Sequence, residues 1–207
     1  MTYKSIYKSY EEQYHQYGDS FKGVGWLRQE DCNKRFKVMS EIFYPNEENI
    51  KILDFGCGLS HFYEYLSNNK DLNGIEYLGL DISQEYIEAS KKKFPNNKYY
   101  CKDILEGDFD FDFDFDYAVI NGVFTQKFSM NDVEMFAFLS SIVEILYNAS
   151  RKGVAFNVMS NYVDFKKDGA FHLSFEKLSN FIIDNLTKNF VIRHDYGLYE
   201  YTVYIYK

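Results

Sequence analysis

Proline, cysteine and tryptophan are scarce in this sequence. Its 207 residues include two prolines, three cysteines and one tryptophan. With few prolines and no linker-like stretch, the chain fits one domain with a short added segment. The cysteines, Cys32, Cys57 and Cys101, are far apart and form no C-x-x-C pair. This spacing predicts reduced thiols in a cytoplasmic protein and gives no indication of a metal site.

Long apolar runs and an excess of positive charge are also absent. No run reaches the roughly 18 apolar residues of a membrane span, and residues 1–20 are too polar for a signal peptide. The chain has 31 acidic and 23 basic residues, which give a formal net charge of −8. That balance disfavours broad nucleic-acid binding, which needs a basic face, and leaves a small molecule as the expected partner. These patterns leave open whether the protein is a monomer or a homodimer.

The abundant residues are aromatic, with 20 phenylalanines and 20 tyrosines. They must supply much of the core, and we expect some of them to line a pocket. In residues 108–116, aspartate and phenylalanine alternate without a break. Period two places the phenylalanines on one face of an extended segment, while repulsion among the aspartates argues against burial of the other face. We interpret this repeat as a solvated connector. A divalent-cation site is the alternative, although no ligand spacing supports it.

Strand and helix patterns alternate along most of the chain, which predicts an α/β fold with a doubly wound, mainly parallel sheet. Expected strands cover residues 51–55, 76–80, 97–101, 117–121 and 153–159, and two β-rich runs at 190–194 and 201–206 should pair as an antiparallel hairpin. Expected helices cover residues 3–17, 29–43, 60–67, 83–94, 132–147 and 174–186. Pro45 is expected to stop the second helix, and Ser83 to cap the fourth.

A glycine turn and a carboxylate follow the first two strands. Residues 50–60 read I-K-I-L-D-F-G-C-G-L-S, and residues 77–83 read Y-L-G-L-D-I-S. Gly56 and Gly58 can adopt backbone angles closed to other residues and let a ligand approach the main chain. Asp81 can accept hydrogen bonds from both hydroxyls of a ribose. Because the carboxyl ends of parallel strands lie at one edge of a sheet, these features predict a nucleotide site there.

The kind of nucleotide depends on the full glycine pattern. The dinucleotide fingerprint G-x-G-x-x-G requires glycine where this chain has His61. The pattern D-x-G-x-G-x-G is matched by Asp54, Gly56 and Gly58, with Ser60 in its last place. At these residues the chain resembles the class I S-adenosylmethionine-dependent methyltransferases, and the resemblance extends over residues 50–207.

The resemblance implies S-adenosylmethionine as cofactor, S-adenosylhomocysteine as product, and a seven-stranded sheet of order 3-2-1-4-5-7-6 that ends in the antiparallel hairpin. In the family, the glycine turn holds the amino-acid part of the cofactor, which here implies Asp54, Gly56, Cys57 and Gly58. The acidic residue after strand two holds the ribose, which implies Asp81 with the adjoining Ile82. An acidic residue after strand three contacts the adenine, which implies Asp103 with Ile104. The alternative for Asp103 is a plain turn residue.

The end of the fourth strand faces the reacting methyl group in the family, which implies roles for Asn121, Gly122 and Phe124. This segment reads N-G-V-F and lacks the [N/D]-P-P-[Y/F] run of methyltransferases that act on DNA amino groups or protein glutamine. Neither proline precedes a cysteine, as the nucleophile of cytosine-C5 enzymes requires. A small-molecule or glycan-precursor acceptor remains.

The N-terminal region is expected to cover this site. We predict a helical cap or lid over residues 1–45 and the cofactor-binding domain over residues 46–207, because glycine-containing loops beside a strand-end cleft can close over a ligand. In this cap, Tyr17 and Trp26 are candidate cofactor contacts and Arg35 is a candidate substrate contact. The alternatives are a core anchor for Trp26 and a surface ion pair for Arg35.

Few residues are expected to act chemically, because methyl transfer mainly requires alignment of acceptor and methyl group and exclusion of water. Asn121 and His172 are the catalytic candidates. His172 would be a general base, since neutral imidazole accepts protons near pH 7, and a surface or capping role is the alternative. His172, Asn157 and Tyr199 lie in segments that face the substrate in the family, so they are also candidate substrate contacts.

Residues 194–201 loosely resemble the ending of methyltransferases from bacterial surface-polysaccharide gene clusters. This resemblance implies a role in capsule or polysaccharide biosynthesis, with O-methylation of a sugar, sugar nucleotide or phosphoramidate-type group. Two other functions stay open. One is a nicotinamide-dependent oxidoreductase, and the other is a non-catalytic partner subunit that kept the fold.

Overall fold

The strands form one mainly parallel sheet. The computed structural model describes residues 3–44, 47–69, 74–106 and 111–207. The strands are β1 (Lys51–Phe55), β2 (Glu76–Asp81), β3 (Lys98–Cys101), β4 (Tyr117–Phe124), β5 (Gly153–Ser160), β6 (His172–Leu173), β7 (Phe190–Arg193) and β8 (Glu200–Tyr206). Their order is β3-β2-β1-β4-β5-β8-β7, and the short β6 pairs with the end of β5. Strands β1 to β5 are parallel, whereas β8 runs antiparallel to β5 and β7.

This topology confirms the predicted order and the C-terminal hairpin. The one difference is β6, which raises the strand number to eight, so the hairpin strands are β7 and β8. Two residues are too few to show an alternating pattern, so this strand could not be predicted from the sequence. Strand β4 also continues beyond the predicted residue 121 to Phe124, with a shift of its pairing to β5 between Ile120 and Phe124.

Helices cover both faces of the sheet. They are α1 (Lys4–Tyr17), the short 3₁₀ helix η1 (Lys22–Val24), α2 (Gln29–Ser40), α3 (His61–Ser67), α4 (Gln84–Lys93), α5 (Asp132–Ala149) and α6 (Phe175–Asn185). The Ser83 side chain caps α4 by accepting from the Tyr86 amide, as predicted. Helix α2 ends at Ser40 instead of residue 43, and Pro45, expected to stop it, lies outside the described residues.

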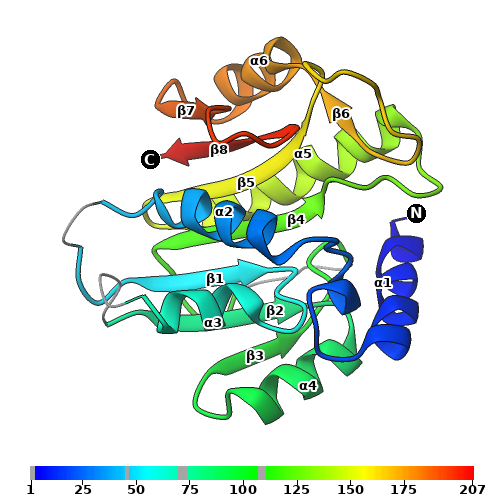
Figure 1. The fold of residues 1–207 in the computed structure, drawn as a ribbon. Helices are drawn as coiled ribbons and strands as arrows, with labels where there is room; N and C mark the ends of the chain where they lie inside the picture. Colours follow the sequence, from blue (N-terminus) through cyan, green and yellow to red (C-terminus); the bar gives the residue numbers. More distant parts are fainter. Residues whose placement is uncertain (1–2, 45–46, 70–73, 107–110) are drawn as a thin grey trace.

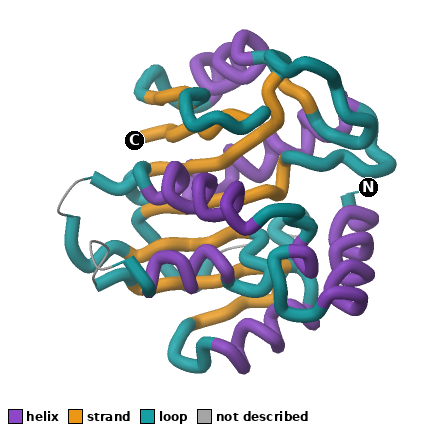
Figure 2. The backbone as a smooth tube through the Cα atoms, viewed as in Figure 1, coloured by secondary structure: helices purple, strands orange, loops and turns teal. Residues whose placement is uncertain are grey.

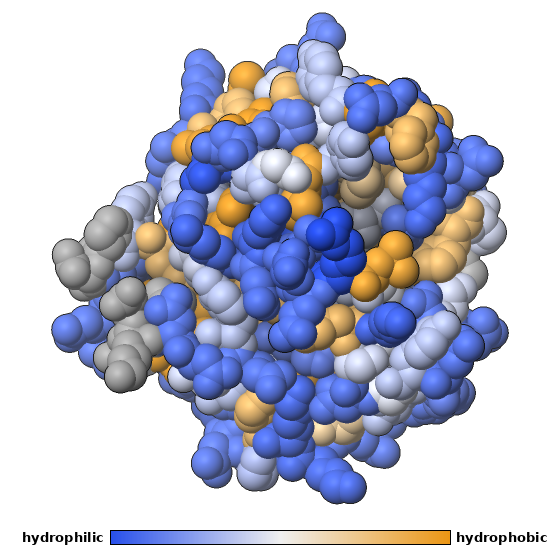
Figure 3. Space-filling view, in the orientation of Figure 1, coloured by the Kyte–Doolittle hydropathy of each residue, from blue (hydrophilic) through white to orange (hydrophobic). Residues whose placement is uncertain are grey.

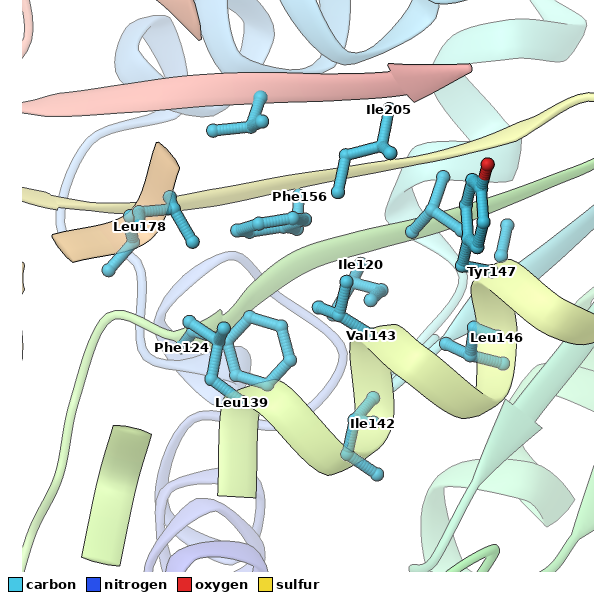
Figure 4. Close-up of a cluster of buried hydrophobic side chains, with 14 of the residues drawn as sticks. Ile120, Phe124, Leu139, Ile142, Val143, Leu146, Tyr147, Phe156, Leu178 and Ile205 are labelled. Atoms are coloured by element: carbon cyan, nitrogen blue, oxygen red, sulfur yellow. The ribbon is translucent and has the colours of Figure 1, made fainter. Parts of the chain in front are cut away.

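The core has two layers because the central strands are apolar on both faces. Helices α2 and α3 lie in front of the sheet in Figures 1 and 2, and α5 lies behind it. On the α5 side, Leu139, Ile142 and Val143 pack with Ile120 of β4 and Phe156 of β5 (Figure 4). Helix α1 belongs to neither layer. It lies beyond the ends toward which β1 and β2 point (Figure 1).

The described part of the aspartate–phenylalanine repeat is not a strand. The rings of Phe111, Phe113 and Phe115 contact one another, and Phe113 stacks on Tyr100 with 4.3 Å between ring centroids. Asp112 and Asp114 are exposed, as expected, whereas Asp116 is buried because its carboxylate accepts a hydrogen bond from the Lys51 amide at 2.9 Å. This half of the repeat leads into β4 with its rings inward. Residues 108–110 lie outside the described residues.

Within the described ranges, no group of three or more potential metal ligands gathers and no helix has the length and apolar character of a membrane span.

Candidate active site

A cavity lies at the carboxyl ends of β1, β2 and β4. It is the place where the sheet reverses its winding, so the loops after these strands separate and leave room for a ligand. The structure brings together most of the residues that the sequence predicted for the cofactor. Those that line the cavity are Asp54, Gly56, Cys57, Gly58, Asp81, Ile82, Asp103, Ile104, Asn121, Gly122 and Trp26.

The glycine turn between β1 and α3 packs closely on the end of β4. Gly56 and Gly58 have φ angles of 71° and 50°, and a Cβ atom on Gly56 would lie 2.5 Å from Val123 Cγ2. Ser60, in the last place of the glycine pattern, also adopts a left-handed φ of 58°. This position is strained for serine, by about 1 kcal/mol, which explains why glycine suits the pattern here.

Asp81 connects the two loops that form the cavity floor. Its Oδ2 accepts a hydrogen bond from the Gly58 amide and its Oδ1 one from the Ser83 amide, each at 2.9 Å. Burial raises the pKa of this carboxyl, while the amide bonds oppose the rise. Each oxygen keeps a second lone pair, so the carboxylate can still accept bonds from two ligand hydroxyls.

Asp54 lies beside Asp81 and is also buried. Tyr77 donates a hydrogen bond from its hydroxyl to Asp54 Oδ2 at 2.6 Å. Burial, with a smaller contribution from the neighbouring Asp81 charge, raises the pKa of Asp54 to about 7, while the Tyr77 hydrogen bond opposes the rise. In the part of the chain that the structure describes, neither carboxylate forms an ion pair with a basic side chain. A ligand with a positive charge would therefore be favoured in this cavity.

Helix α1, part of the cap expected over residues 1–45, covers the cavity, and sequence reasoning missed only which of its residues line it. Tyr3, Ile6, Tyr7 and Tyr10 of α1 line it. The Tyr3 hydroxyl donates to Asp103 Oδ2 at 2.8 Å, and the Tyr3 ring stacks on Phe138 of α5 at 5.3 Å. The available signal was the spacing of tyrosines along one face of the predicted helix 3–17, which indicated an amphipathic helix but not which of its tyrosines face the cavity.

Asn121 presents an unsatisfied polar group to the cavity. Its side-chain Oδ1 and Nδ2 atoms are both buried and have no hydrogen-bond partner among the described residues. Buried amides are normally bonded, so an unpaired one in a cavity indicates a missing polar ligand. The next residue, Gly122, has a φ of 87°, and a Cβ atom there would lie 2.4 Å from the Trp26 ring. Trp26 therefore packs on the turn that orients Asn121.

A buried polar network lies behind this turn. The Gly122 amide donates to Asn157 Oδ1 at 2.7 Å, and Asn157 Nδ2 donates to Glu200 Oε1 at 3.0 Å. Arg35 Nε lies 2.8 Å from both Glu200 carboxylate oxygens, and its guanidinium covers the Trp26 ring at 4.2 Å. Arg35 and Asn157, predicted as substrate contacts, do not line the cavity. They support the loop that does, and Glu200 completes the network without any signal in the sequence.

The remaining predicted residues lie away from the cavity. Phe124 has no exposed surface, because its ring packs into the core against Phe138 and Phe156. Tyr17 is exposed at the end of α1, and Tyr199 is exposed and donates to Asp164. His172 Nδ1 donates to the Ser160 carbonyl at 2.6 Å, which leaves Nε2 buried and unpaired within the described chain. Its role as a base stays a prediction.

Comparison with known proteins identifies the family. A family model described as a methyltransferase domain matches residues 53–148. Rv1506c of Mycobacterium tuberculosis H37Rv, a protein named as a methyltransferase, is 30% identical over 163 residues, which cover 75% of this chain and 92% of that protein. The chain is a class I S-adenosylmethionine-dependent methyltransferase. It is therefore an enzyme of methyl transfer and not a nicotinamide-dependent oxidoreductase.

This protein shares its fold with solved methyltransferases, although the sequence identity is low. The magnesium protoporphyrin IX methyltransferase ChlM from Synechocystis PCC 6803, with bound S-adenosylmethionine, has a TM-score of 0.61 at 14% identity over 100% of this chain and 98% of its own. The plantazolicin methyltransferase BpumL, in complex with S-adenosylhomocysteine, has a TM-score of 0.64 at 15% identity over 100% of this chain and 93% of its own.

The residues of the cavity fit S-adenosylmethionine, which is the cofactor of this methyltransferase. The cofactor carries a sulfonium and an ammonium group, and the buried carboxylates of Asp54 and Asp81 form no ion pair with a described basic residue. Asp81 keeps free lone pairs for the ribose hydroxyls, and the unpaired Asn121 amide can bond a polar group of the ligand. Gly56 and Gly58 line the cavity without side chains, so the ligand can approach their main chain.

Proposed function

We propose that this methyltransferase transfers the methyl group to an oxygen of a small-molecule or glycan-precursor acceptor. The observation that carries this proposal is the position of α1 across the cavity. Tyr3, Tyr7 and Tyr10 form one wall of the cavity, and Tyr3 is bonded to Asp103. A duplex or a folded protein surface cannot approach a site covered in this way, whereas a small acceptor can enter beside the helix.

Two further observations support a small acceptor. The end of β4 reads N-G-V-F, without the double proline of enzymes that act on DNA amino groups or protein glutamine. The formal net charge of −8 also disfavours binding to the phosphates of a nucleic acid. By the same reasoning we propose that nucleic acids and membranes are not partners of this enzyme.

S-adenosylmethionine supplies an activated methyl group whose leaving group needs no proton. The protein's own residues then have three tasks. Asp81 and the glycine turn hold the cofactor, and Asp103 and Ile104 border the adenine. Asn121, fixed by the Gly122 turn, orients polar atoms at the reacting end. The tyrosines of α1 exclude water from the cavity, which prevents competing hydrolysis and strengthens the electrostatic interactions.

We also propose a role in surface-polysaccharide biosynthesis in the cytoplasm. The support is the C-terminal sequence resemblance, together with the three free thiols of Cys32, Cys57 and Cys101, which suit a reducing compartment. In this proposal residues 1–45 supply the cap, chiefly through α1 and η1, and residues 46–207 bind the cofactor. Both a monomer and a homodimer are compatible with it.

The test begins with calorimetric titration of S-adenosylmethionine, S-adenosylhomocysteine and NAD into the wild type and Asp81→Asn. Asparagine keeps an acceptor for one of the two backbone amides and removes the charge. Loss of the charge-assisted ribose contacts should cost about 1.5–3 kcal/mol, about ten- to a hundredfold in affinity. Asp184→Asn, an exposed carboxylate on α6, is the matched control. Tight binding of the sulfur compounds that Asp81→Asn does not weaken would contradict the assignment.

A screen of hydroxyl-bearing acceptors with labelled methyl groups follows. Transfer to an oxygen of a sugar or sugar nucleotide supports the proposal. Transfer only to nitrogen, or only to protein or nucleic acid, refutes it. Cofactor binding with no transfer to any acceptor would favour the non-catalytic partner subunit.

A further inference from the structure

A polar groove adjoins the cofactor cavity on the face covered by α2 and α3. It is lined by residues of the α1–η1 loop, α2, α3 and the end of α4, and it shares His61 and Phe36 with the cavity. Figure 3 shows this face of the molecule, where hydrophilic residues predominate over α2 and α3. A molecule bound in the groove would therefore meet the cofactor cavity at His61.

His61 at this junction is oriented by a carboxylate. Its Nε2 lies 3.0 Å from Asp19 Oδ1, and its ring packs against Phe21 at 4.8 Å between ring centroids. Because a carboxylate accepts, Nε2 carries the proton and Nδ1 keeps a lone pair. No hydrogen bond to Nδ1 forms within the part of the chain that the structure describes. A base held by a third group, with its other nitrogen free, is the arrangement that general-base catalysis requires.

The charged residues that line the groove leave no unpaired cation and a small excess of negative charge. Lys93 Nζ lies 3.3 Å from Asp19 Oδ2 and 2.7 Å from Glu64 Oε2. Its positive charge is thus already paired with two carboxylates, and among the described lining residues it is the one lysine or arginine. A phosphate or other anion would meet a net negative surface here. The groove accordingly suits an uncharged molecule.

The uncharged lining residues supply hydrogen bonds and ring faces. The side-chain amides of Gln29 and Asn33 form no hydrogen bond with other described residues, so each can donate and accept. The half-buried Tyr65 packs its ring against Phe36 at 5.7 Å between centroids. Amides that both donate and accept match hydroxyl groups, and aromatic faces match the C–H surface of a saturated ring.

We propose that this groove binds the acceptor as an uncharged, hydroxyl-bearing ring such as a sugar, and that His61, oriented by Asp19, is the general base in place of His172, which does not line the cavity. The inference rests on the proposed function and assigns its acceptor site. The hydroxyl proton moves to His61 Nδ1 while the acceptor oxygen forms a bond to the methyl carbon. The electron pair of the broken carbon–sulfur bond stays on sulfur, and His61 then releases the proton to water.

The protonation state of His61 agrees with this role. Burial lowers its pKa, and the charge of Lys93 lowers it further, while Asp19 and Glu64 oppose the shift. The imidazole is therefore neutral at pH 7 and able to accept a proton. Turnover should rise with pH through a pKa below the ordinary value for histidine and stay level above it.

The experiment has a binding step and a kinetic step. The protein, saturated with S-adenosylhomocysteine, is titrated by saturation-transfer NMR with glucose, galactose, rhamnose and N-acetylglucosamine, and with the 1-phosphate of each. We expect a neutral sugar to bind more tightly than its phosphate. Asn33→Leu should weaken that binding by about 2- to 12-fold through loss of a hydrogen bond. Asn148→Leu, an exposed asparagine on α5, should leave it unchanged.

In the kinetic step, His61→Gln should lower the turnover number for the bound sugar by about 10²- to 10⁴-fold and abolish the pH step. Its dissociation constants for the sugar and S-adenosylhomocysteine should stay within a few-fold of wild type. If S-adenosylhomocysteine binds but no neutral sugar does, or if His61→Gln keeps its turnover, the groove proposal is overturned and methyl transfer stands. Failure to bind S-adenosylhomocysteine would instead refute the proposed function.

Discussion

The buried ion pair between Arg35 and Glu200 allows a quantitative test of how the Asn121 turn is held. Glu200 is 1% exposed, and the Arg35 side chain is 14% exposed. Arg35→Met removes the cation but keeps a side chain of similar length against Trp26. The glutamate is then left buried without its partner. Breaking a buried pair in this way costs about 3–5 kcal/mol of unfolding free energy.

The second arm removes the charge from the other partner as well. In Arg35→Met/Glu200→Gln no buried charge remains, and the glutamine oxygen still accepts from Asn157. We expect the double variant to recover more than half of the loss, because the penalty of an isolated buried charge disappears. Burial raises the pKa of Glu200 while Arg35 opposes the rise. The destabilisation of Arg35→Met should therefore be smaller at acidic pH, where Glu200 can bind a proton.

Urea unfolding followed by fluorescence of Trp26 measures this effect, since Trp26 is the only tryptophan and lies against Arg35. Arg28→Met is the control, because that side chain is 69% exposed and its ion pair with Glu30 is long, at 3.6 Å. An exposed pair of this kind contributes less than about 1 kcal/mol. The reasoning fails if Arg35→Met is no more destabilising than Arg28→Met, or if the double variant is no more stable than Arg35→Met.

Three further predictions concern the cofactor cavity. The folded pKa of Asp54 is about 7, above the ordinary 3.8, so the folded state binds this proton more tightly than the unfolded state does. The free energy of unfolding should therefore fall by up to about 1.4 kcal/mol per pH unit as the pH rises between these two values. Asp54→Asn should remove this slope in urea titrations at several pH values, and an unchanged slope would exclude Asp54 as its source. Gly56→Ala should destabilise the protein by about 1–3 kcal/mol more than Gly169→Ala. Both glycines have a positive φ, but of the two only Gly56 would place a Cβ atom within 4 Å of another residue. Equal losses of stability in thermal unfolding would contradict this. Tyr3→Phe removes the hydrogen bond from α1 to Asp103. In stopped-flow measurements it should speed dissociation of S-adenosylhomocysteine by about 2- to 12-fold, whereas Tyr7→Phe should not. Equal dissociation rates for the two variants would show that α1 does not hold the ligand.

The cofactor half of the site could be predicted from sequence because its residues follow strands directly. Asp54, Gly56 and Asp81 lie within or next to continuous strand patterns, and a parallel sheet necessarily brings such strand ends together. The acceptor half could not be predicted in this way. Arg35 and Asn157 were expected at the substrate, yet they form a buried network with Glu200, whose partners lie 165 and 43 residues away along the chain.

The sequence by itself determined the alternation of strands and helices, the glycine turn and the carboxylate of Asp81, because local periodicity and short motifs encode them. The sheet order followed from the resemblance to the methyltransferase family that these motifs carry. Only the tertiary structure decided which residues of α1 reach the cavity and that Asp19 meets His61, 42 residues away. In the sequence, His61 was only the residue that broke a glycine fingerprint. The physical reason is that an amphipathic helix must pack against another element and a buried histidine must bond to another residue, but the local sequence does not determine which one. The packing of distant elements supplies that partner.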